Sequence, residues 1–174
     1  VGDTAVFLGY SIPRTEFSTN LGVTLFNNRV RVGGQLDYRG DFKQVNLTDY
    51  FRCTSGAANN CQALNDPTAP LDLQARTIAG RTAALGATSA GFIEDADFLK
   101  LRELSFTYYA PDGVARALRV SRASFTLTGR NLATITGYSG VDPEVNQIGQ
   151  SDFVRDFLTQ PPVTYWTFRV NLGF

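Results

Sequence analysis

The feature that most constrains the fold of this chain is an alternation of apolar and non-apolar residues in five separate segments. In the last one, Thr164–Phe174, every second residue from Trp166 onward is apolar or aromatic, and the residues between are polar or glycine. Successive side chains of a β-strand point to opposite faces, so a period of two predicts a strand with one apolar face. The predicted strands cover residues 16–26, 29–39, 98–109, 120–130 and 164–174.

The second face of these strands separates two classes of all-β protein. In a soluble β-sandwich this face meets water and would carry many Lys and Glu residues, whereas here it carries Thr, Ser, Asn, Gln, Gly and Arg. Strands of about 9–11 residues with an apolar outer face are typical of an outer-membrane barrel. The pattern therefore favours an all-β, antiparallel, up-and-down wall of a transmembrane β-barrel, with the β-sandwich as the alternative.

The connections between the predicted strands alternate in length. Short links follow the first and third strands, at Asn27–Asn28 and at the sequence PDGVARAL, and long loops cover residues 40–97 and 131–163. In an antiparallel meander all short links then lie at one end of the sheet and all long loops at the other. Loops of this length are usually functional, and we expect a helix at 71–85 within the first one.

The third strand changes the parity of its apolar positions halfway along. Leu99 and Leu101 are odd-numbered, whereas Leu104, Phe106 and Tyr108 are even-numbered. A β-bulge near residues 102–103 inserts one extra residue and would bring both halves onto the same face.

Composition excludes several function classes. Sixteen basic and sixteen acidic residues give a net charge of zero, so nothing electrostatic favours nucleic acid. No apolar run reaches the roughly 18 residues of a membrane helix, which argues against a helical membrane protein but not against a barrel. There is no His, the commonest general base and a frequent metal ligand, and no Ser-elbow motif or facing carboxylate pair. We therefore expect no enzyme activity, no cofactor and no metal.

The chain also contains no Met and no signal peptide at its start. These two observations suggest a processed or partial chain.

Two cysteines, Cys53 and Cys61, flank seven residues rich in Gly, Ala and Asn. A disulfide that closes a surface loop is the favoured prediction, and it implies an oxidising compartment. Zinc would need two further ligands, and none stands nearby. Two free thiols are the remaining alternative.

A set of motifs, in this order, resembles the C-terminal end of TonB-dependent outer-membrane transporters of the SusC/RagA type. They are an acidic lead-in, a Phe-Leu-x-Leu-Arg-x-Leu-x-Phe-x-Tyr strand, a Gly-x-Asn-Leu strand end, an Asp-Pro-Glu loop and a final Asn-Leu-x-Phe. Their residues are Glu94 and Asp95; Phe98 to Tyr108; Gly129, Asn131 and Leu132; Asp142, Pro143 and Glu144; and Asn171 to Phe174. The sequence GYSIPR at Gly9–Arg14 is similar to the approach to an earlier strand.

The resemblance implies a fold larger than this chain. Transporters of this type have a plug domain, a TonB-contacting segment and about 22 strands around a plugged lumen. Five strands cannot close a barrel, since about eight is the smallest common number. We therefore expect a C-terminal barrel segment that lacks the plug and whose two edge strands pair with the remainder of the same barrel.

The resemblance also implies an orientation and a set of partners. The terminal Phe174 would form part of the signal read by the barrel-assembly machinery and would lie at the periplasmic rim, facing outer-membrane lipid. The two long loops would be extracellular, beneath a SusD-like lipoprotein, and TonB would act through the missing N-terminal region. The expected localisation is the outer membrane of a diderm bacterium.

Candidate site residues follow from the predicted faces and loops. Inward-facing side chains would contact the plug or the substrate, or would only pair across neighbouring strands; these lumen-facing candidates are Arg31, Gln35, Asp37, Arg39, Arg130, Tyr165 and Arg169. Three residues of the second long loop, Tyr138, Asp142 and Glu144, are candidates for contact with ligand or lipoprotein.

The predicted function is that of a segment of an energy-coupled importer of bulky nutrients, either oligosaccharides or peptides. The alternative is a structural or adhesive surface module that self-assembles, because open strand edges also pair between chains.

Overall fold

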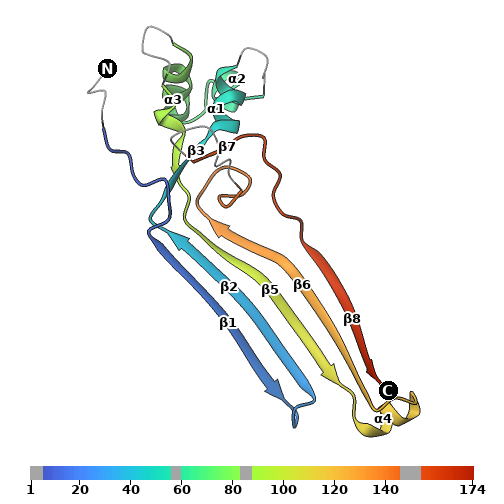
Figure 1. Ribbon diagram of the computed structural model, residues 1–174. Coiled ribbons are helices and arrows are strands. Elements are labelled where there is room, and N and C mark those ends of the chain that lie inside the picture. The colour runs from blue at the N-terminus through green and yellow to red at the C-terminus, as the bar shows by residue number, and fades with distance from the viewer. Residues whose placement is uncertain (1–5, 56–59, 83–87, 146–153) are drawn as a thin grey trace. The chain divides into compact units, whose positions relative to one another are not determined.

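The structure is a computed structural model that describes residues 6–55, 60–82, 88–145 and 154–174 (Figure 1). The chain divides into two compact units. The strand unit comprises Glu16–Arg39, Leu99–Ile135 and Pro162–Phe174, and the loop unit comprises Val1–Thr15, Gly40–Phe98 and Thr136–Pro161.

The strand unit is one five-stranded sheet with the order β1-β2-β5-β6-β8 (Figure 1). Its members are β1 (Thr15–Leu25), β2 (Val30–Gly40), β5 (Phe98–Tyr109), β6 (Arg122–Thr136) and β8 (Tyr165–Gly173). The predicted antiparallel, mostly β fold is confirmed, and β1 and β8 form the two edges of a sheet that does not close on itself within this chain.

The register between β6 and β8 separates two faces of this sheet. Phe125 lies opposite Val170 and Leu127 opposite Phe168, whereas Thr128 lies opposite Thr167. Apolar pairs therefore alternate with polar pairs along the whole ladder, as a period of two requires. We call these surfaces the apolar face and the polar face.

Strand β6 is longer than the sequence predicts and continues to Thr136 instead of ending at 130. The predicted end is the Gly-x-Asn-Leu motif, and Asn131 does adopt a positive φ of 53° there. Asn is tolerant of that conformation, and the side-chain amide of Asn131 donates to the carbonyl of Val163 at 3.1 Å. The motif thus marks an irregularity inside a strand.

The two short connections differ from each other. The Asn27–Asn28 turn has positive φ at both residues, in agreement with the prediction. The second link, predicted as a turn, is the six-residue helix α4 (Asp112–Ala117). Its Ala115 packs with Val120 and Ala123 in a small apolar cluster.

Contacts of β5 fit the bulge predicted at residues 102–103. Arg102 donates to Asp37 on β2 at 2.7 Å, and the next residue, Glu103, accepts from Arg130 on β6 at 2.9 Å. Consecutive residues of a regular strand point to opposite faces, yet both of these side chains contact partners on the polar face.

The loop unit contains more structure than the single helix predicted for it. A small sheet has the order β4-β3-β7, from Ile93–Asp95, Lys43–Asn46 and Arg155–Asp156. The helices are α1 (Leu47–Thr54), α2 (Gln62–Asn65), α3 (Leu71–Arg81) and the 3₁₀ helix η2 (Ala90–Phe92). Helix α3 ends at Arg81, before the predicted residue 85, and residues 83–85 lie outside the described residues.

The core of the loop unit forms around the predicted disulfide. Cys53 and Cys61 are bonded, and both pack against the fully buried ring of Phe92. Helix α1 begins at an Asn46 cap, whose side-chain oxygen accepts from the backbone N–H of Asp49 at 2.9 Å. None of the helices in the described part of the chain has the length and hydropathy of a membrane-spanning helix.

Candidate functional site

The polar face of the strand unit carries the lumen-facing candidates. Its loop-proximal half, where β2 and β6 run toward the long connections, is a network of charge pairs. Asp37 accepts from Ser18 at 2.6 Å and from Arg102 at 2.7 Å, and Arg39 lies 3.7 Å from Glu16. Cross-strand pairing, one of the two roles expected for these candidates, therefore engages Asp37 and Arg39.

Two further candidates form a second set of contacts on the same face. The Nε atom of Arg130 donates to Glu103 at 2.9 Å, and its Nη1 atom contacts the Tyr165 hydroxyl at 3.4 Å. Arg130 and Tyr165 also face each other in the β6–β8 register. Gln35 lies half-buried on the same face of β2.

The turn-proximal half of the polar face, toward Asn27–Asn28 and α4, is different. Among the residues that the structure describes, no hydrogen bond or ion pair reaches the guanidinium groups of Arg31 and Arg169, and both side chains are exposed. Arg122 is also exposed and unpaired within the described residues, and sequence reasoning missed it. The signal was available, because Arg122 shares the parity of Arg130 along β6.

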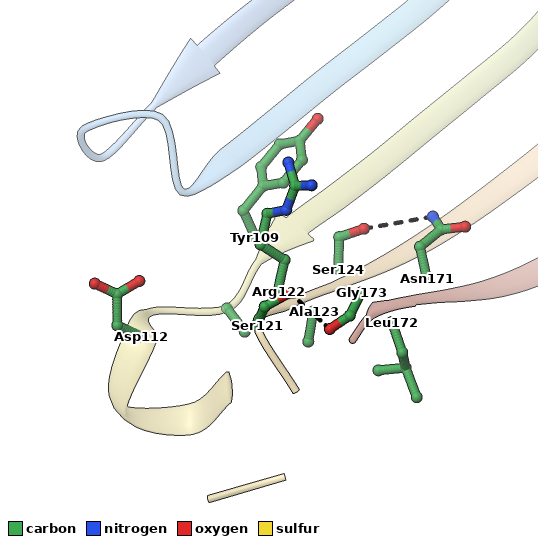
Figure 2. A pocket seen from close by; sticks show the side chains of 10 residues that line it. Tyr109, Asp112, Ser121, Arg122, Ala123, Ser124, Asn171, Leu172 and Gly173 are labelled. Carbon is green, nitrogen blue, oxygen red and sulfur yellow. Dashed lines mark hydrogen bonds between the residues drawn. The ribbon is translucent and has the colours of Figure 1, made fainter. Parts of the chain in front are cut away.

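A surface hollow of about 490 Å³ lies beside Arg122 (Figure 2). Tyr109, Ser124 and Asn171 line it from β5, β6 and β8, and the Asn171 amide contacts the Ser124 hydroxyl at 3.4 Å. Ser121 also lines the hollow, and its hydroxyl donates to the carbonyl of Gly173 at 2.8 Å.

The candidates from the second long loop are placed in the interior of the loop unit. Tyr138 and Asp142 are only 5% and 6% exposed. The Tyr138 hydroxyl donates to Asp156 at 2.6 Å, and Asp142 accepts from the backbone N–H of Glu144 at 2.9 Å. Both Tyr138 and Asp142 are buried within this unit, whereas Glu144 is half-buried. Contact of these three residues with ligand or lipoprotein stays a prediction.

Burial also changes the acid–base behaviour of Tyr138. Desolvation, followed by the hydrogen bond to Asp156, raises the pKa of Tyr138 above its ordinary value. The phenol therefore stays protonated and remains a hydrogen-bond donor across the physiological range.

A partly buried charge cluster in the loop unit was not predicted. Arg76 on α3 donates to Asp49 at 2.7 Å and to Glu94 at 3.3 Å. Glu94 in turn accepts from the Ser139 hydroxyl at 2.8 Å. The cluster joins segments that lie far apart in the sequence, so no local pattern could reveal it, although the Asn46-x-x-Asp49 spacing signals the helix cap. Glu94, the acidic lead-in of the motif, therefore has a structural role.

Phe174, the proposed assembly signal, is 97% exposed and follows β8. No group of His, Cys, Asp or Glu residues in the described part of the chain could hold a metal ion.

Comparisons with known proteins agree with the fold. TonB-dependent receptor P3 of Formosa agariphila is 28% identical over 89 residues, which cover 48% of this chain and 9% of the receptor. The RagAB peptide importer in its closed-closed state matches with a TM-score of 0.67 at 21% identity, over 97% of this chain and 18% of that chain. The same importer in its open-open state matches with a TM-score of 0.65 at 20% identity, over 94% and 17%. No protein-family model matches.

These similarities confirm the resemblance to SusC/RagA-type TonB-dependent transporters that the motifs indicate. The chain spans less than a fifth of the length of the proteins it matches.

Proposed function

We propose that this chain is the C-terminal wall segment of a TonB-dependent outer-membrane importer. The imported nutrient is bulky, either an oligosaccharide or a peptide, and a SusD-like lipoprotein covers the extracellular loops. The segment performs no covalent chemistry. Its work is to complete the barrel wall and to line the path of the substrate.

The observation that carries this proposal is the exposed apolar face of the five-stranded sheet. Large side chains on β1, β5, β6 and β8 are exposed by 40% or more; they include Phe17, Leu21, Val23, Phe106, Leu127, Trp166, Phe168, Val170 and Leu172. Soluble monomers rarely expose contiguous apolar patches larger than a few hundred Å², since each Å² left in water forgoes roughly 25 cal/mol. Contact with lipid removes that cost, and the opposite face is polar, as in a barrel that encloses water or a plug.

Strand direction supports the proposed orientation. The short links at Asn27–Asn28 and α4 would be periplasmic, as short turns are in outer-membrane barrels, and the loop unit would be extracellular. The terminal Phe174 would then lie at the periplasmic rim, available to the barrel-assembly machinery. The unpaired edges of β1 and β8 would pair with the preceding strand and the first strand of the same barrel.

The matched RagAB assembly is a peptide importer. That similarity supports peptide import as one form of the proposal, while oligosaccharide import remains the other form.

The test is the intact mass of the native polypeptide that carries this sequence, taken from the outer-membrane fraction under denaturing conditions. We expect a mass several-fold above 19.0 kDa, because a plug and about seventeen further strands are needed to complete the barrel. A native mass of 19.0 kDa would overturn the proposal.

That second result would favour a self-assembling structural or adhesive module. The two open sheet edges are the observation behind this alternative, because unpaired strands also pair between copies. A multichain barrel or filament would then be visible by electron microscopy of the purified 19.0 kDa chain.

A further inference from the structure

Helix α4, the short link between β5 and β6, packs on the apolar side of the five-stranded sheet. Its Ala115 is buried against Val120 and Ala123. Ala123 belongs to the apolar face, because it lies opposite Leu172 in the β6–β8 register. In Figure 2, Ala123 and Leu172 point to the side of the sheet on which α4 lies, whereas Arg122 points to the other side. The link therefore lies against what would be the outer side of the barrel wall.

The position of α4 within the sheet keeps it away from the parts of the barrel that this chain does not supply. The two strands that α4 joins pair in turn with β2 and β8, so α4 does not lie at an edge of the sheet. In the proposed barrel the remaining strands would add beyond the edges, next to β1 and β8, and a plug would fill the lumen on the polar side. Neither addition covers the outer side of the wall at α4.

The end of α4 has a backbone conformation that usually selects glycine. The N–H of Val120 donates to the carbonyl of Ala115 at 3.0 Å. The N–H of Arg119 donates to the carbonyl of Arg116, also at 3.0 Å. These two hydrogen bonds form a Schellman motif, in which Arg119 is the C′ residue and has a φ of 58°. Gly adopts this conformation without the steric cost of a Cβ, so the backbone does not explain why an arginine stands there.

The exposed side chains of α4 form an apolar flank and a basic flank. Val114 and Leu118 are exposed and lie one turn apart, so they share a flank of the helix. Arg116 is two residues from each of them, or about 200° around the helix, which places it on the opposite flank. Arg119 is exposed as well. Apolar side chains next to arginines are typical of a segment that lies in a membrane interface.

The charge of this link favours an anionic partner. Residues 111–121 include two arginines and one acidic residue, Asp112, a net charge of +1. The Nε atom of Arg116 donates to the backbone carbonyl of Asp112 at 3.3 Å. That acceptor is neutral, so the contact does not cancel the charge of the guanidinium. A guanidinium also presents a planar fork of donors that pairs with a phosphate through two parallel hydrogen bonds.

We infer that α4 is an interfacial anchor that binds the headgroups of anionic phospholipids at the turn end of the sheet. This inference rests on the proposed function, because it takes the apolar face to meet lipid and the turn end to be periplasmic. Val114 and Leu118 extend the apolar face into the acyl region, and Arg116 and Arg119 pair with the phosphates. The partner is the phospholipid leaflet that borders the periplasm.

The experiment maps which lipids contact α4 in the purified full-length protein. The protein is reconstituted into phosphatidylethanolamine vesicles that contain either phosphatidylglycerol or phosphatidylcholine with a photoactivatable headgroup, at equal content, and crosslinked peptides are identified by mass spectrometry. We expect the phosphatidylglycerol probe to label the α4 peptide about fivefold more, because a basic residue near a membrane surface favours anionic lipid by about that factor. The preference should shrink as salt is raised.

The double variant Arg116→Gln with Arg119→Gly should abolish this preference. Gly is the residue that the C′ position favours, so Arg119→Gly alone should weaken the preference while the melting temperature stays unchanged or rises. Arg122→Gln is the matched control, since it removes the same charge near the same link but from the polar face. The control should keep the preference of about fivefold.

Four results would overturn the inference. They are equal labelling of α4 by both headgroup probes, no labelling of α4 by either, a preference that survives the double substitution, and a melting temperature that falls in Arg119→Gly. The second would mean that water or another protein segment meets α4, and the fourth that Arg119 holds the fold.

A third probe, with the photoactivatable group in its acyl chain, separates this failure from failure of the proposed function. Labelling of β8 by the acyl-chain probe without a preference at α4 sinks the inference alone and leaves the importer proposal intact. A β8 strand that the acyl-chain probe does not label would sink the proposed barrel wall, and the inference with it.

Discussion

The strand unit and the loop unit are stabilised in different ways although one chain supplies both. The strand unit has two faces, one apolar and exposed, the other polar and partly charge-paired, with only a small buried cluster at α4. The loop unit has a disulfide, fully buried aromatic rings and a partly buried ion-pair cluster. The loop unit thus resembles a small domain that carries its own core, whereas the strand unit depends on what surrounds it.

Charge separates the two units as well. The chain is neutral overall, but the strand unit has a net charge of +6 and the loop unit, with six basic and twelve acidic residues, has −6. A whole-chain charge of zero therefore hides two oppositely charged parts. Long-range electrostatic attraction depends on the excess charge of one region. The strand unit therefore attracts negatively charged partners and the loop unit positively charged ones.

The largest effect that tests this comparison comes from placing a charge on each face of one strand. Phe168→Arg puts a cation on the apolar face, and we expect it to destabilise the assembled full-length protein by roughly 2–4 kcal/mol, since lipid cannot solvate it. Thr167→Arg, one residue earlier on the polar face, should cost less than about 0.5 kcal/mol. Urea unfolding of the reconstituted protein measures both. Equal costs would show that the two faces meet the same surroundings.

A second test is directed at the loop unit alone. Replacing Cys53 and Cys61 by Ser removes a covalent link across a sequence separation of eight, which should destabilise the unit by about 2.5 kcal/mol through the entropy of the opened chain. Hydrogen exchange should accelerate in α1 and α2 and stay unchanged in β6 and β8. Faster exchange in those strands would mean that the two units do not unfold separately.

The third test concerns the glycine that faces Trp166 in the β6–β8 register. A Cβ added to Gly129 would come within 2.8 Å of the Trp166 ring, so Gly129→Ala should cost about 1–3 kcal/mol through overpacking. Gly113→Ala, where nothing lies within 4 Å, is the control and should be nearly neutral. In a Trp166→Ala background, Gly129→Ala should cost much less, because the ring that the new Cβ meets is gone. If the costs of the two substitutions simply add, the proposed contact between them is contradicted.

The two units also differ in how far the sequence predicts them. The alternation that reveals β8 arises because its two faces have different surroundings. Every residue from Tyr165 to Gly173 therefore indicates which face it lies on. Strand β3 has only four residues, and it pairs with partners about fifty and more than a hundred residues away, such as Ile93 and Arg155. Four residues are too few for a period, and such pairings depend on tertiary contacts that no local pattern encodes.

The site shows the same contrast. Parity along the strands places Asp37, Arg39 and Arg130 correctly on one face, and it would also have found Arg122. Parity does not say which arginines lack a partner, because that depends on the strand register and on the bulge in β5. In the loop, the sequence offers Tyr138 as a candidate for ligand contact but does not indicate its burial, because the partner of its hydroxyl, Asp156, lies eighteen residues away in the chain.

The smallest predicted effect is a pH dependence confined to the loop unit. Burial and the hydrogen bond to Asp156 raise the pKa of Tyr138 above its ordinary value of 10.0. Because the folded-state pKa of Tyr138 is higher than its unfolded value, the buried phenol stabilises the folded loop unit. That stabilisation is fully present below about pH 10 and is lost as the pH rises further. Alkaline titration followed by tyrosinate absorbance should therefore show a late-titrating phenol that Tyr138→Phe removes.

The same substitution tests the stability of the loop unit at neutral pH. Tyr138→Phe should cost about 1–2 kcal/mol there, because it leaves the carboxylate of Asp156 without that donor. Tyr165→Phe, on the exposed polar face of the strand unit, is the control and should leave the late phenol in place. A late phenol that persists in Tyr138→Phe would contradict the burial of Tyr138. The loop unit would then lack a closed core of its own, and the difference between the two units would rest on the disulfide and the ion-pair cluster alone.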